Sequence, residues 1–208
     1  MTPDPDAPLA AAFWSLVEEG GWRGVTAPRL AARAGVPVEE LLSRFRTRLD
    51  LIGFASEAVD REVEAGTVHG QGGSPRDRLF DVLMRRVDAL QAHRAGVLRL
   101  GREAATDPVI GLALARALPR SMARMLDAAG LDPTGAGGAL RRTGLVGVWL
   151  VTLRAWERDV NPDLGTTMAA LDRALERAEQ AARSFGVTPG DLEPPPLDPE
   201  LASPAAGA

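Results

Sequence analysis

The chain has 208 residues, of which 45% are hydrophobic, 25% are charged and 4% are aromatic. This length fits one domain, or one domain with a small appendage, and the absence of cysteine excludes disulfides and thiolate metal sites. All 24 basic residues are arginine, and 28 acidic residues bring the net charge to -4. Any contact with nucleic acid must therefore come from a local patch.

Two features argue against export and against a membrane span. The longest uninterrupted apolar run, residues 145–151, is about a third of the length that a bilayer span requires. The amino-terminal sequence MTPDPDAP carries two acids and no arginine before the first apolar run, the reverse of a secretory signal. We therefore expect a soluble, cytoplasmic protein.

Glycine and proline divide the sequence into segments whose apolar residues recur at helical spacing. We predict helices, in chain order, over about 8–19, 27–34, 37–45, 47–66, 75–93, 94–105, 108–129, 139–158 and 162–185. Thr47 with Asp50, and Ser74 with Asp77, have the spacing of capping boxes. Because no alternating β-branched or aromatic run is bounded by hairpin turns, we predict an all-α fold.

We divide the chain into three parts. Residues 8–50 are predicted to form a three-helix domain with a helix-turn-helix, and residues 51–185 a larger helical ligand-binding and dimerisation domain. Six of the last 22 residues are proline, so we predict that residues 186–208 are a disordered tail.

The last two predicted helices have the pattern of an interface. Residues 168, 171, 175, 178, 182 and 185 are apolar at spacings of three and four, and the segment 145–153 is apolar nearly all round. A helix that is apolar on all sides must be covered on all sides. We expect a homodimer through the helices 139–158 and 162–185, the alternative being that both close a bundle within one chain.

The segment 21–52 has the pattern of a helix-turn-helix. Two short helices are joined by Ala34-Gly35-Val36, and the apolar residues that can lock them are Leu30, Ala31, Val36, Leu41 and Leu42. Six arginines and two glutamates lie between Arg23 and Arg48, a local charge of +4 in a chain of -4. This asymmetry is typical of a surface that contacts DNA.

Residues 13–52 resemble the DNA-binding domain of the TetR family of bacterial transcriptional regulators. The resemblance depends on Glu18-Glu19-Gly20-Gly21-Trp22, Val25-Thr26, Leu30-Ala31, Ala34-Gly35-Val36, Leu41, Phe45, Arg48 and Asp50-Leu51-Ile52. It implies a homodimeric repressor that binds double-stranded operator DNA and is relieved by a small apolar or amphipathic effector. The helix 37–45 would then enter the major groove.

The resemblance also implies which residues contact DNA: Thr26, Arg29, Glu39, Glu40, Ser43, Arg44, Arg46 and Arg48. Thr26 and Arg48 would contact phosphates, whereas Ser43 and Arg44, with Glu39 or Glu40, would select bases. Members of the family commonly have small or hydroxyl residues at the positions of Glu39 and Glu40, and an aromatic residue at the position of Leu42.

A second resemblance gives an alternative function. Residues 88–100 and the tryptophan-rich penultimate helix are similar to the carboxyl-terminal half of a ubiquinone-biosynthesis lipid-binding protein that shares the TetR fold. It implies a lipid- or isoprenoid-binding accessory protein that does not bind DNA.

Tryptophan and methionine residues are candidates for an effector cavity. Trp149 and Trp156 lie seven residues apart on one predicted helix face. Their candidate neighbours are Phe80, Met84, Met122 and Met125. The same residue types at helical spacing also form ordinary core, so both interpretations stay open.

The residue inventory does not favour catalysis. Two histidines, no cysteine and no tyrosine supply neither a metal cluster nor an evident nucleophile with its base, so we expect no enzyme, no metal and no cofactor. His93 falls at a predicted helix carboxyl terminus, where an imidazolium would complement the helix dipole.

Overall fold

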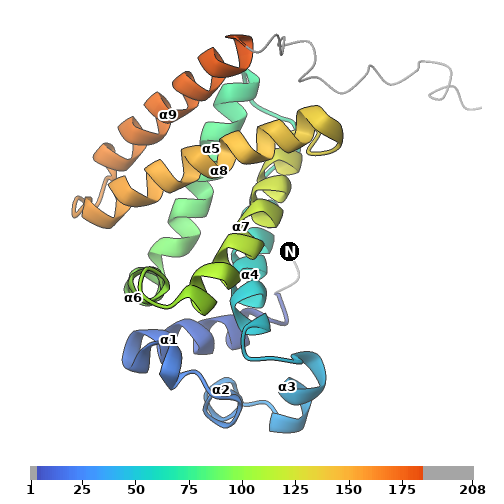
Figure 1. Ribbon diagram of the computed structural model, residues 1–208, viewed down its shortest axis with the longest axis vertical. Helices are drawn as coiled ribbons and strands as arrows, with labels where there is room; N and C mark the ends of the chain where they lie inside the picture. Colours follow the sequence, from blue (N-terminus) through green and yellow to red (C-terminus); the bar gives the residue numbers. More distant parts are fainter. Residues whose placement is uncertain (1–3, 185–208) are drawn as a thin grey trace, which may run out of the picture.

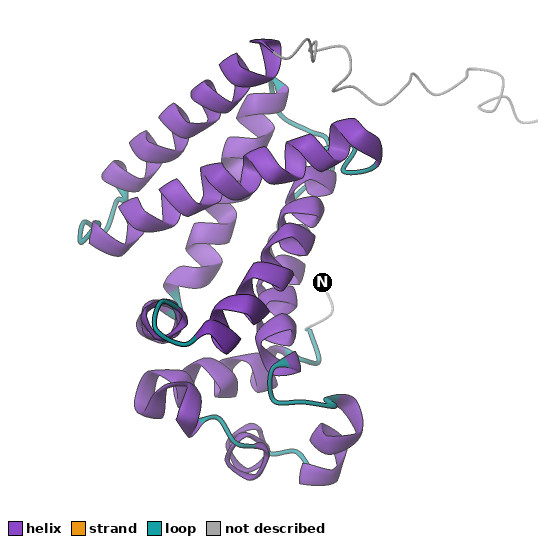
Figure 2. Cartoon of the chain, viewed as in Figure 1, coloured by secondary structure: helices purple, strands orange, loops and turns teal. Residues whose placement is uncertain are grey.

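The computed structural model describes residues 4–184, and within this range the regular secondary structure is entirely helical (Figures 1 and 2). The all-α prediction is confirmed, while the predicted tail lies outside the described residues. The helices are α1 (Ala7–Gly24), α2 (Ala27–Ala34), α3 (Val38–Arg44), α4 (Asp50–Ala65), α5 (Pro75–Gln91), α6 (Arg94–Ala104), α7 (Pro108–Ala128), α8 (Gly135–Arg158) and α9 (Gly165–Ser184).

Capping chemistry accounts for several helix starts. The capping box of Ser74 and Asp77 is present as predicted at the start of α5. At α4 the backbone N–H of Thr47 donates to Asp50 at 2.7 Å, but the regular helix begins only at Asp50. Helix α8 begins at Gly135 rather than at 139, because Asp132 accepts bonds from the amide and hydroxyl of Thr134 and turns the chain into the helix.

Two apolar cores lie one above the other along the long axis of the molecule (Figure 1). The lower core, which we call the head, is built mainly from α1 to α3 and the first half of α4, with Leu100 of α6 and Ile110 of α7. The upper core, which we call the body, is built from α5, α7, α8 and α9 with Val59 and Val63 of α4. Helix α4 therefore belongs to both cores and connects them.

The joint between head and body is made by α1 and α6. Gly21 has a φ of 65° and interrupts α1 where the sequence predicted its end. Arg99 of α6 donates to the carbonyl of Glu18 at 2.8 Å, and Glu103 accepts the N–H of Trp22 at 2.7 Å. A Cβ on Gly96 would lie 2.8 Å from the carbonyl oxygen of Trp14, so the two helices are too close there for a larger residue.

His93 lies at this joint, between α5 and α6. It is the residue before the first turn of α6 rather than the last residue of a helix, and its ring stacks on Trp14 with centroids 6.0 Å apart. Burial lowers the pKa of His93, which favours the neutral ring. His93 follows the carboxyl terminus of α5 directly, as expected, but its lowered pKa disfavours the predicted imidazolium.

A buried ion pair lies within the body. Arg86 of α5 pairs with Asp60 of α4, and the hydroxyl of Ser121 on α7 donates to the same carboxylate at 2.7 Å. The Arg86 guanidinium also lies over the Trp149 ring, 5.1 Å from its centroid. Three helices of the body are thus linked through one carboxylate. No helix among residues 4–184 is long and apolar enough to span a membrane.

Candidate nucleic-acid interface

Helices α2 and α3 form the predicted helix-turn-helix at the lower end of the molecule (Figure 1). Gly35 has a φ of 72° and ends α2, and the N–H of Val36 bonds back to the carbonyl of Ala31 at 3.1 Å. Leu30 and Leu41 are buried between the helices, as expected. The expectation that Leu42 takes part in this lock is wrong: it follows the inward-facing Leu41 by about 100° of helical rotation and is 63% exposed.

The outward face of α3 carries the residues predicted to read bases. Glu39, Glu40, Leu42 and Ser43 are exposed. The Ser43 hydroxyl donates to the carbonyl of Glu40 at 2.8 Å, which leaves its oxygen able to accept. This face therefore offers two carboxylates, one hydroxyl and one apolar side chain, and no positive charge.

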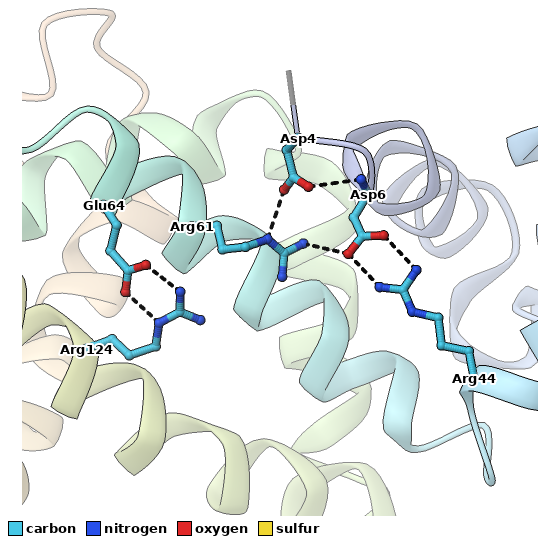
Figure 3. Close-up of polar contacts among 6 residues, drawn as sticks. All are labelled: Asp4, Asp6, Arg44, Arg61, Glu64 and Arg124. Atoms are coloured by element: carbon cyan, nitrogen blue, oxygen red, sulfur yellow. Dashed lines mark hydrogen bonds and ion pairs between the residues drawn. The ribbon is translucent and has the colours of Figure 1, made fainter. Parts of the chain in front are cut away.

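Arg44, at the end of α3, turns toward the amino-terminal segment. Its two terminal nitrogens donate to the Asp6 carboxylate at 2.6 and 2.5 Å (Figure 3). Its guanidinium also lies over the ring of Phe54, 5.0 Å from the centroid. The hydrogen bond from Arg44 holds the pKa of Asp6 below its ordinary value. In this arrangement Arg44 secures the end of α3 and does not extend toward a ligand.

The same Asp6 carboxylate also binds α4. Arg61 of α4 donates to Asp6 at 3.1 Å and to Asp4 at 3.0 Å (Figure 3). We call the contacts of Asp4 and Asp6 with Arg44 and Arg61 the acidic clamp. Arg44 and Arg61 lie 38 and 55 residues from Asp6 in the chain, so no local sequence pattern indicates these pairs.

Two further arginines of the predicted patch share one acidic partner, Glu19 of α1. Arg33 donates to both Glu19 oxygens at 2.8 and 3.0 Å, and this hydrogen bonding lowers the pKa of Glu19. Arg29 lies 3.7 Å from the same carboxylate and donates to the carbonyl of Gly24 at 2.9 Å. The three side chains are about half exposed, and the single carboxylate offsets one of the two positive charges.

The remaining candidates are available to an anion. Arg46 is exposed and has no ion-pair partner among residues 4–184. The Arg48 guanidinium lies over the Trp22 ring, 4.5 Å from its centroid, and it too has no carboxylate partner in that range. Thr26 precedes α2 with extended backbone, and its hydroxyl makes no bond to the first turn of α2. Arg46, Arg48, Thr26 and the outward face of α3 together are the candidate interface.

The six residues predicted to line an effector cavity lie in and around the core of the body. Met122, Met125, Trp149 and Trp156 are buried there, while Phe80 and Met84 pack against it and are half-buried. The Trp156 ring nitrogen donates to Gln91 at 2.7 Å. Phe80 also lines a shallow surface hollow with Met168, but none of the six lines the apolar groove described next.

An apolar groove of about 260 Å³ opens between α5, α7, α8 and α9. Its walls include Leu79, Leu126, Leu140, Leu145 and Leu175, and Arg76, Arg141 and Arg183 also line it. No sequence pattern indicates this groove, because four separate helices contribute to its walls. Within residues 4–184, no cluster of three acidic or histidine side chains is arranged to hold a metal ion.

The arrangement of helices is similar to that of solved transcriptional regulators. A TetR transcriptional regulator from Nitrosomonas europaea superimposes with a TM-score of 0.64 and 22% sequence identity, over 85% of this chain and 99% of that chain. Another from Rhodococcus sp. RHA1 gives a TM-score of 0.53 and 23% identity, over 83% and 93% of the two chains. No protein-family model and no curated protein matches the chain. The likeness shows that this chain has the TetR-type fold.

Proposed function

We propose that this protein is a TetR-like transcriptional regulator that binds operator DNA with the helix-turn-helix of α2 and α3. The single observation that carries the proposal is the geometry of this motif: Gly35 ends α2 in the left-handed conformation, and Leu41 anchors an α3 whose opposite face is exposed. An exposed short helix held in this way fits the major groove.

The charges of the interface determine how it would bind. Arg44 is paired with Asp6, and Arg29 and Arg33 share Glu19. Arg46 and Arg48, which have no acidic partner within residues 4–184, are therefore the candidate phosphate contacts. Glu39 and Glu40 can accept hydrogen bonds from cytosine amino groups. Binding would therefore depend on few phosphate contacts, and selectivity on the carboxylates and on Ser43.

We propose a homodimer through α8 and α9, as two reading helices must meet successive major grooves roughly 34 Å apart. The face of α8 outside the apolar groove supports this, because Leu150 and Val151 are about half exposed and Gly147 lies one turn before Val151. Such a stripe of apolar and small residues can pack against its own copy. Sedimentation measures the oligomeric state, and a monomer at micromolar concentration would contradict the dimer.

We also propose that the bound regulator represses transcription and that an apolar effector relieves this repression. The apolar groove, rather than the tryptophan core, is the candidate effector site in the body. The groove also favours the alternative of a lipid- or isoprenoid-binding accessory protein that does not bind DNA. Lipid that co-purifies with a protein unable to bind DNA would support this alternative.

The experiment is a titration against DNA from upstream of the protein's own gene between 50 and 200 mM salt. When Arg46 and Arg48 of both heads each contact a phosphate, four contacts are made, and the slope of log affinity against log salt is about -4. Arg48→Ala should make the slope shallower by about one unit per head. Arg85→Ala is the matched control, because it removes one exposed arginine from α5, away from α2 and α3, and should leave the slope unchanged. Absence of specific binding at low salt would refute the proposal.

A further inference from the structure

A polar cleft lies between α4, α7 and the start of α8, on a different part of the surface from the α3 face. It has a volume of about 600 Å³, within the range of small-molecule sites. Four arginines line it, Arg116, Arg120 and Arg124 of α7 and Arg142 of α8. We call it the arginine cleft.

Three of these arginines have no partner. Arg116, Arg120 and Arg142 make no hydrogen bond, ion pair or ring contact with any residue between 4 and 184. Arg116 and Arg120 lie one turn apart on the same face of α7, where two like charges repel each other and destabilise the helix. A bound anion would remove this repulsion.

The other charges of the arginine cleft are mostly balanced. Arg124 is held by Glu64 of α4 through two bonds of 2.5 Å, and Asp60 at the buried floor is paired with Arg86. Glu57 is the remaining acid of the lining. Within the described part of the chain, three unpaired arginines therefore face one unpaired carboxylate, which leaves an excess of two positive charges.

The shape and the remaining lining restrict the ligand further. Gly53, Ala117, Pro119 and Ala123 supply small apolar surfaces beside the arginines. Arginine forks bind phosphate and carboxylate groups in pairs of parallel hydrogen bonds. We propose that the arginine cleft binds a small organic dianion, either a phosphate monoester or a dicarboxylate, with its charge on Arg116, Arg120 and Arg142.

Helix α4 connects this site with α3. Glu64, which holds Arg124, lies one turn from Arg61, and Arg61 holds Asp4 and Asp6 of the acidic clamp (Figure 3). Arg124 lines the cleft beside the three unpaired arginines, so an anion bound to them lies next to the Arg124–Glu64 pair and acts on α4, whose Arg61 holds Asp6. Occupancy of the cleft is coupled to DNA binding through α4, and this step rests on the proposed function.

The site is tested by calorimetric titration of the full chain, without DNA, using phenyl phosphate and phthalate, with benzamide as the uncharged control. Wild-type protein should bind at least one dianion and not benzamide, and Arg116→Gln with Arg120→Gln should weaken binding at least tenfold. Arg85→Gln with Arg102→Gln, which remove the same charge from α5 and α6, should change it less than twofold. Failure of both dianions to bind at millimolar concentration, or equal binding by the two double variants, would overturn the site.

A second measurement separates this inference from the proposed function. The bound dianion should change operator affinity by roughly five- to 100-fold, and the Arg116/Arg120 double variant should lose this effect. Dianion binding without any DNA binding would support the site and refute the proposed function. DNA binding that is the same with and without a bound dianion would overturn the coupling through α4.

Discussion

Replacing Asp6 by asparagine tests the acidic clamp with almost no change of shape. The carboxylate receives two bonds from Arg44 and one from Arg61, at 2.5 to 3.1 Å. The Asp6 side chain is only 18% exposed, whereas that of Arg44 is 39% exposed, so solvent screens part of the attraction. Because these hydrogen bonds are charged and partly screened, we expect Asp6→Asn to lower the unfolding free energy by about 1.5 kcal/mol and Tm by roughly 3–6 °C.

The assay is urea denaturation followed by circular dichroism. Because the pKa of Asp6 is lowered in the folded protein, its contribution is complete above the ordinary value of 3.8 and is lost as pH falls through the folded pKa. The difference between wild type and Asp6→Asn should therefore shrink in acid. Asp88→Asn, at an exposed carboxylate with no partner in the described range, is the control.

A double-mutant cycle with Arg44→Gln isolates the pair. The interaction energy should be at least about 0.5 kcal/mol, because the two side chains are in direct contact. Additive effects, or an Asp6→Asn variant within about 0.3 kcal/mol of wild type, would refute the reasoning that the clamp holds α3.

Two further substitutions test buried groups. Asp60→Ala leaves the Arg86 charge buried without its partner and should lower the unfolding free energy by about 3–5 kcal/mol. The double variant Asp60→Ala with Arg86→Met, which removes both charges, should recover most of this loss. A loss below about 1 kcal/mol for Asp60→Ala, measured by denaturation, would contradict this expectation. His93 has its pKa lowered by burial, so its contribution is complete above the ordinary value of 6.5 and is lost as pH falls through the folded pKa. Tm measured from pH 7.5 to 5 should thus fall more steeply in wild type than in His93→Gln, and equal slopes would count against the buried neutral ring.

Features of the head that depend on local sequence could be predicted. Gly35 was expected to end a helix because a left-handed residue is favoured there, and the spacing of Leu30, Ala31 and Leu41 predicted a buried lock. Ser74 and Asp77 form a capping box within four consecutive residues. Each of these features is set by neighbours along the chain.

Features that depend on distant neighbours could not be predicted in this way. The charge of +4 between Arg23 and Arg48 counts arginines whose partners lie elsewhere: Arg44 meets Asp6, which is 38 residues away in sequence. Trp149 and Trp156 have the same helical spacing whether they line a cavity or fill a core. Only the packing of other helices against them distinguishes the two cases, so the apolar groove and the arginine cleft were not foreseen.

The head takes part of its apolar interior from outside its own segment, since Leu100 and Ile110 pack with residues of α1 to α4. A chimera that joined residues 4–50 to an unrelated effector domain would leave this interior without cover and would misfold or aggregate. Exchange of the head with that of another protein of this fold would have to transfer α6 and the first turn of α7 as well. The smallest portable form of the head is thus discontinuous in the chain.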